Sequence, residues 1–190
     1  MKTTKKIGKT EFIKLGTVPF VKAKDMTEAI KDCGFRESPN WQIDDKSFPW
    51  RQPRRPDFEA QLASFPIHPY LFELQEDDKF KLPAGWVHAS HIHLISYHRM
   101  LPEEYRPKKQ IVAAGFVGRT SGGSRQEVLT LLGDGRGGSR LVRGDDTGLD
   151  DEWVETPYRR ILYLHLWRKY FDDCHFLIVR KDARKSGSGR

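Results

Sequence analysis

Cysteine is scarce in this sequence, and long apolar runs are absent. Cys33 and Cys174 are the only cysteines and lie far apart, which excludes a disulfide framework and the paired spacing of a zinc ribbon. We expect both to be buried and inert. No stretch approaches the ~20 apolar residues of a membrane span, and no apolar core of a signal peptide follows the charged N-terminus. These absences favour a soluble cytoplasmic protein.

Acidic residues are outnumbered by basic ones. The chain has 33 Lys and Arg against 26 Asp and Glu, which gives a formal net charge of +7. Such a balance indicates a polyanionic partner, because Lys and Arg bound to phosphates release condensed counterions. DNA is the partner we favour. The alternative is that the basic residues near the two ends of the chain bind no partner and are only solvated, which would give the same composition. An acidic run over 145–155 is typical of a solvated loop or a mimic of nucleic-acid charge, with an Mg²⁺ site as the weaker alternative.

The usual sequence signatures of hydrolases are also missing. There is no Gly-x-Ser-x-Gly elbow and no full P-loop. Four histidines, His88, His91, His93 and His98, fall close together. If residues 86–97 form a strand, His91 and His93 share a face and resemble a metal-binding pair. Ordinary hydrogen-bonded histidines are the interpretation we favour, and we predict no metal site.

What is present predicts one compact α+β domain over residues 1–180, with a mixed sheet and several covering helices. A hydrophobic fraction of 37% in 190 residues is enough for one sizeable core. The tail at 181–190 is polar and is expected to be disordered. The pattern predicts an edge strand or a bulged strand at 11–21, strands at 67–74, 86–97, 109–117 and 174–179, and helices at 26–33, 56–65, 125–132 and 157–171. The first helix is signalled by a capping box, an apolar face and a stop residue: Asp25 with Glu28, then Met26, Ala29 and Ile30, and Gly34. The last helix has an alternative, because residues 160–167 also alternate like a strand.

A loop rich in tryptophan and proline is expected over 38–56. Arg51, Arg54 and Arg55 follow Trp50 there, and guanidinium groups beside a flat ring suit phosphates and unpaired bases. These four residues are our candidate nucleic-acid contacts. The alternative places the tryptophans in the core and the arginines in solvent.

A glycine-rich turn follows the predicted strand at 109–117. Gly122 and Gly123 precede Ser124, which would cap a helix from Arg125 with Glu127 completing a capping box. Free N–H groups at a helix start favour an anion, and Arg119 and Arg125 would flank it. We therefore predict phosphate or nucleotide binding by Arg119, Gly122, Gly123, Ser124 and Arg125. A turn with purely geometric glycines is the alternative.

The Gly122-Gly123-Ser124-Arg125 turn resembles the phosphate-holding turn of the ParB/sulfiredoxin-like superfamily. Ser124 stands where sulfiredoxins have cysteine, so their thiol chemistry is not expected. In size and basic character the chain is also similar to the plasmid fertility-inhibition proteins of the oncogenic-suppression type. That resemblance implies an ATP-hydrolysing nuclease that blocks DNA transfer, with ATP and Mg²⁺ as cofactors.

The combined prediction is a DNA-associated protein of a plasmid or other mobile element. If it is an enzyme, Arg125 would neutralise charge that develops in the transition state, and Glu127 would place water or metal. The sequence leaves open whether catalysis occurs. The alternative is a non-enzymatic inhibitory module that binds a protein partner through the Trp/Arg-rich loop, since these residue types are enriched at interface hot spots.

Overall fold

The computed structural model describes residues 11–33, 43–64, 82–102, 110–120, 125–133, 153–155, 160–166 and 174–181. Within them the chain forms eight strands and two helices, so the predicted α+β class is confirmed. Their order is β1 (Glu11–Pro19), α1 (Met26–Asp32), β2 (Asp57–Ser64), β3 (Trp86–His88), α2 (His91–Met100), β4 (Gln110–Thr120), β5 (Arg125–Gly133), β6 (Trp153–Glu155), β7 (Arg160–Leu166) and β8 (Cys174–Arg180).

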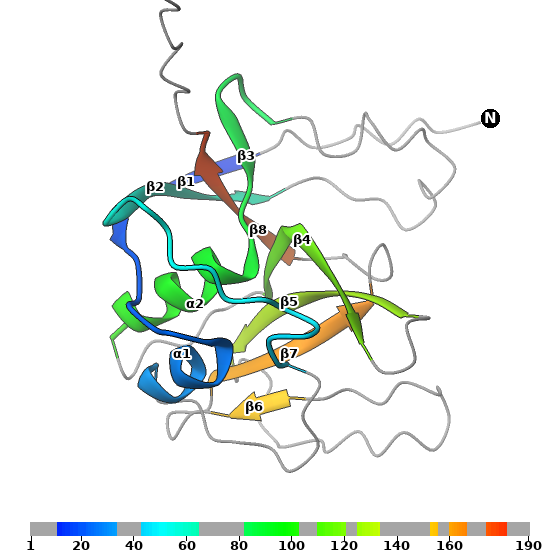
Figure 1. Cartoon of the computed structure of the whole chain (residues 1–190). Coiled ribbons are helices and arrows are strands. Elements are labelled where there is room, and N and C mark those ends of the chain that lie inside the picture. Colours follow the sequence, from blue (N-terminus) through cyan, green and yellow to red (C-terminus); the bar gives the residue numbers. More distant parts are fainter. Residues whose placement is uncertain are drawn as a thin grey trace, which may run out of the picture.

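All eight strands belong to one sheet, in the order β1-β2-β8-β4-β5-β7-β6, with β3 pairing alongside β4 on the same edge of β8. The β4–β8 pair is parallel and the other pairs are antiparallel, so the sheet is mixed as predicted. Figure 1 shows the sheet bending around α2, with β1, β2 and β8 above the helix and β7 and β6 below it. Helix α2 contacts β1, β4 and β5.

Strand β1 is an end strand of this sheet and carries the expected bulge. Its register against β2 shifts between Lys14 and Gly16. Gly16 has φ +85°, a conformation that a side chain disfavours. A bulge and a lysine are common devices that keep an edge strand from pairing with other chains.

Helix α1 begins where the local sequence predicts. The Asp25 carboxylate accepts a hydrogen bond from Glu28 N at 2.8 Å, and the Glu28 carboxylate accepts one from Lys24 N at 2.6 Å. The apolar face formed by Met26, Ala29 and Ile30 is buried as expected. Gly34, the predicted stop signal, lies outside the described residues.

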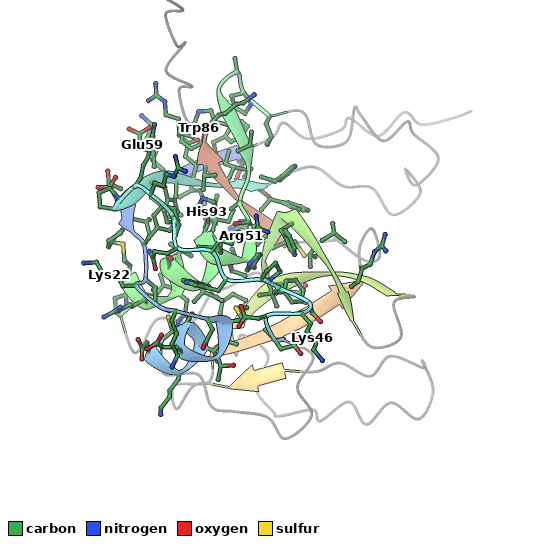
Figure 2. The ribbon with its side chains drawn as sticks, viewed as in Figure 1. Lys22, Lys46, Arg51, Glu59, Trp86 and His93 are labelled. Carbon is green, nitrogen blue, oxygen red and sulfur yellow. The ribbon has the colours of Figure 1, made fainter. Side chains whose placement is uncertain are left out.

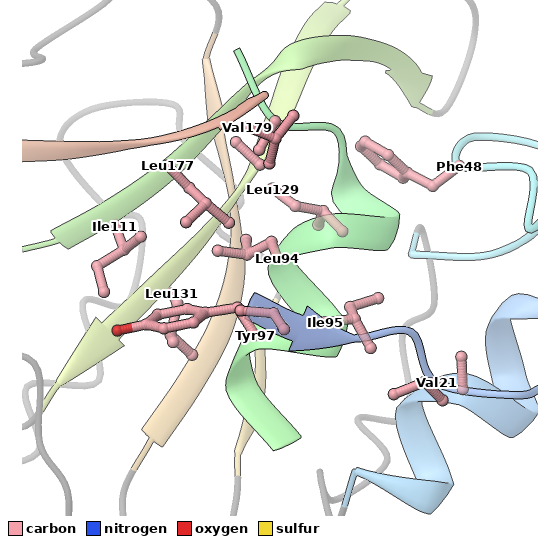
Figure 3. Close-up of a cluster of buried hydrophobic side chains, with 14 of the residues drawn as sticks. Val21, Phe48, Leu94, Ile95, Tyr97, Ile111, Leu129, Leu131, Leu177 and Val179 are labelled. Atoms are coloured by element: carbon pink, nitrogen blue, oxygen red, sulfur yellow. The ribbon is translucent and has the colours of Figure 1, made fainter. Parts of the chain in front are cut away.

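Helix α2 is the centre of the core. Its buried side chains lie at nearly every position from His91 to His98, so it has no solvent-facing stripe of polar residues. Leu94 and Ile95 are completely buried, and Figure 3 shows Leu94 beside Leu177 and Leu129 of the sheet. A second apolar cluster lies on the other face of the sheet and contains Ala63, Val112, Ala114, Val128, Cys174, Phe176 and Ile178.

Four predicted elements differ from the structure. The segment at 56–65 is not a helix but strand β2, with Phe58, Ala60 and Leu62 buried on one face. The segment at 86–97 is a strand only to His88 and then becomes α2. The segment at 125–132 is strand β5. Residues 160–166 form β7, so the strand alternative holds and the helix at 157–171 does not.

Strands β4 and β8 confirm the predictions for 109–117 and 174–179. The predicted strand at 67–74 and the tail at 182–190 lie outside the described residues. Within the described part of the chain, no helix is long and apolar enough to cross a membrane.

Candidate nucleic-acid interface

Residues 43–56 cross the face of α2 without regular secondary structure, and buried groups hold them there (Figure 1). The Asp45 carboxylate accepts hydrogen bonds from Met26 N and Trp50 N, both at 2.9 Å. Phe48 is fully buried and packs edge-on against His91, with ring centroids 5.6 Å apart. The segment is therefore an integral part of the folded body, although its sequence is typical of a surface loop.

The end of this segment lies beside residues 20–24. Phe20 N donates to Pro56 O at 2.8 Å, and Ala23 N donates to the Gln52 side-chain oxygen at 3.2 Å. These contacts join positions about thirty residues apart in the chain. Their exposed basic side chains form what we call the basic strip: Lys22, Lys24, Arg51, Arg54 and Arg55. Figure 2 labels Lys22 at the left margin of this surface and Arg51 nearer its middle.

The basic strip carries five positive charges, and neither 22–24 nor 51–55 contains an acidic residue. On strands β8 and β2, by comparison, Arg180 pairs with Glu59 at 2.9 Å. A concentration of basic side chains on adjacent segments creates a positive potential that attracts a polyanion. Lys22 and Lys24 were not among the residues predicted from the sequence, because nothing in the local pattern links them to 51–55.

Trp50 is not available for stacking. Its indole is only 7% exposed and belongs to the main hydrophobic core. The prediction that Trp50 contacts nucleic acid is therefore wrong, and the alternative that it lies in the core is right. Arg51, Arg54 and Arg55 are exposed, as both interpretations required. Trp41 lies outside the described residues.

The histidines do not have the strand geometry that suggested a metal-binding pair. His91 and His93 lie on helix α2 and not on a strand, so their spacing of two no longer puts them on one face. His93 Nδ1 lies 2.8 Å from Ser90 Oγ at the helix start, and its ring packs against Phe58 with centroids 4.7 Å apart. Among the described residues no group of three or more His, Cys, Asp or Glu side chains is placed to bind a metal ion.

His91 instead fastens the 43–56 segment to α2. Its Nε2 lies 3.1 Å from Pro49 O, and its ring contacts Phe116 with centroids 4.6 Å apart. Burial lowers the pKa of His91 to about 4, against weaker opposing effects of the Pro49 carbonyl and the Asp45 charge. Burial likewise lowers the pKa of His88 to about 4. Both rings are therefore neutral at pH 7.

The helix that was predicted to begin at Arg125 and bind phosphate is a strand in the structure. Arg125 begins strand β5, and β5 pairs antiparallel with β4 so that Thr120 faces Arg125 and Gly118 faces Glu127. A strand has no dipole or row of free N–H groups comparable to a helix start. Gly122, Gly123 and Ser124 lie outside the described residues, while Arg119 is exposed near the end of β4. Phosphate binding by this turn stays a prediction without the helix argument.

Neither Cys33 nor Cys174 forms a disulfide, and the expected burial holds for Cys174 but not fully for Cys33. Cys174 is buried and its thiol lies 3.3 Å from the Gln110 side-chain oxygen, whereas Cys33 is only partly buried.

Comparison of the chain with family models, with curated proteins and with solved structures finds no match. The class supported by fold and site is accordingly an α+β protein with a basic surface strip.

Proposed function

We propose that this protein binds nucleic acid, and DNA in particular, through the basic strip. The observation that carries the proposal is the pair of hydrogen bonds that join 20–24 to 52–56, because they bring two separate basic segments together. One bond joins two backbone groups and the other joins a backbone N–H to the Gln52 side chain, so the backbones of the two segments are held together before a ligand arrives. Binding to a prearranged surface costs less ordering entropy than binding to a disordered tail.

Arginine supports this assignment more strongly than lysine would. A guanidinium group offers parallel N–H donors that match two phosphate oxygens. Arg51 and Arg54 are exposed and lie on either side of Pro53, which restricts the backbone between them. The strip therefore suits repeated phosphates along a nucleic-acid backbone.

The test is fluorescence anisotropy of labelled DNA over a series of salt concentrations. The double variant Arg51→Gln/Arg54→Gln should weaken binding and reduce the slope of log K against log salt by about 2, since each lost phosphate contact on B-DNA contributes about 0.9. The matched control is Lys14→Gln/Lys181→Gln, which removes the same charge from exposed positions outside the strip. The control should keep most of the wild-type slope.

Equal losses in the two double variants would mean that net charge and not the strip determines binding. Absence of binding to any DNA at low salt would refute the proposed function.

The finer proposal, an ATP-hydrolysing nuclease of a plasmid that acts in the cytoplasm, rests on the resemblance of Gly122-Gly123-Ser124-Arg125. Addition of ATP and Mg²⁺ to the same samples, followed by a gel, tests for cleavage, and Arg125→Ala tests the turn. The alternative is a non-enzymatic protein-binding module that uses the Trp/Arg-rich loop; burial of Trp50 removes one of the loop's two tryptophans from such a contact.

A further inference from the structure

We infer that the basic strip binds double-stranded DNA through its phosphates alone, without stacking on bases. This inference rests on the proposed function and adds the class of ligand and the mode of contact. It follows from how the aromatic rings and backbone groups of the two segments are used within the fold.

The aromatic rings within the two segments pack against the core, one fully buried and one partly buried. Residues 20–24 and 50–56 contain two aromatic side chains, Phe20 and Trp50. The Trp50 indole is buried in the core. Phe20 packs against Phe58 with centroids 4.7 Å apart and against His93 with centroids 5.3 Å apart. The Trp50 ring is closed to a base, and Phe20 is partly buried by its two ring contacts.

Backbone N–H groups of the two segments are also engaged in hydrogen bonds within the fold. Val21 N donates to the buried Ser96 hydroxyl at 3.1 Å, and Ala23 N donates to Gln52. Pro53 and Pro56 have no N–H group to offer. The two segments lie flat on the body of the protein and contain no helix or strand that could enter a groove and reach base edges. Long, exposed basic side chains remain as the groups that extend outward, and phosphates are the groups they fit.

This arrangement favours a duplex over a single strand. A DNA duplex presents one negative charge about every 1.7 Å along its axis, twice the density of one strand. Proteins that prefer single strands gain about 1–3 kcal/mol for each base stacked on an aromatic ring. Among the described residues of the strip, Trp50 is buried and Phe20 is partly buried against Phe58 and His93. The strip therefore gains the charge density of a duplex and offers little of the stacking that would favour a single strand.

The experiment compares three labelled ligands of equal length by anisotropy: a duplex, one of its strands, and a strand in which abasic sites replace every base. The duplex should bind most tightly, and the ordinary and abasic strands should bind within two-fold of each other. The variant Trp50→Phe, which keeps an aromatic ring in the core, should leave all three affinities unchanged.

Two outcomes would overturn the inference: abasic binding weaker than that of the ordinary strand by roughly five-fold or more, the effect of one stacked base, or a selective loss of single-strand binding in Trp50→Phe. The proposed function survives either result, because DNA still binds. Failure of every ligand to bind at low salt refutes the proposed function itself, so the two failures are distinguishable.

Discussion

Acidification should destabilise this protein through His91. The ring is 2% exposed, and its Nδ1 has no hydrogen-bond partner among the described residues. Burial lowers its pKa from 6.5 to about 4. Between these pH values His91 is protonated in the unfolded chain and neutral in the folded chain. The protein therefore loses stability as the pH falls from 6.5 to about 4, and above this range His91 makes no pH-dependent contribution.

The size of this effect follows from the pKa difference. A lowering from 6.5 to about 4 at 1.36 kcal/mol per unit gives roughly 3 kcal/mol of stability lost to acid. That is a substantial part of the ~5–15 kcal/mol by which domains are normally stable. His88, whose pKa is also lowered to about 4 by burial, adds a loss of the same sign.

The assay is urea unfolding at several pH values between 7.5 and 4, with wild type and His91→Phe compared throughout. Phenylalanine keeps the aromatic contacts with Phe48 and Phe116 and removes the titrating group. Loss of the contact with Pro49 O should cost the variant about 1 kcal/mol at neutral pH. Its stability should then fall roughly 3 kcal/mol less than wild type on acidification.

Phe116→Leu is the control, because it weakens the same cluster and leaves His91 in place. Its pH profile should run parallel to that of wild type at a lower stability. Parallel profiles for wild type and His91→Phe would refute the reasoning, since they would mean that His91 is protonated equally easily in the folded and unfolded chains.

Two further predictions concern packing. Gly115→Ala should destabilise the fold by about 2–4 kcal/mol in urea unfolding, because the added Cβ would lie 2.1 Å from His88 O, a backbone atom that no side-chain rotation can move. The control is Gly16→Ala, which should cost only about 1–2 kcal/mol, because Gly16 has φ +85° but nothing within 4 Å of the added Cβ. Equal losses in the two variants would contradict the packing argument. Thr130→Val should stabilise the protein by about 1 kcal/mol, since the Thr130 hydroxyl is buried with no partner among the described residues; a large loss of stability would reveal a hydrogen bond from the rest of the chain.

Local sequence was sufficient where an element depends on its own neighbours. The Asp25 and Glu28 side chains cap α1 within four residues, and Gly16 marks the bulge of β1. Strands β4 and β8 were recognisable because each is a compact apolar run. Helix α2 was missed for two reasons: it is buried on nearly all sides, which removes helical periodicity, and its capping box uses His93 in place of the usual Glu or Gln.

The segments at 56–65 and 125–132 show why periodicity alone was insufficient. Phe58 and Leu62 are four apart, which is one helical turn and also two strand repeats, so their spacing fits both structures. In β5 the four residues from Val128 to Leu131 are all buried. That happens because β5 is paired on both edges and lies against α2, and neighbours distant in sequence supply those contacts.

The sequence by itself determined the basic character of the protein, the α+β class, the cap of α1 and the exposed arginines at 51, 54 and 55. Only the tertiary structure decided that Trp50 is buried and that Lys22 and Lys24 join those arginines. The physical reason is that Ala23 N and the Gln52 side chain meet only after the chain has folded around α2. A hydrogen bond between positions 29 residues apart cannot be predicted from the local sequence around either position.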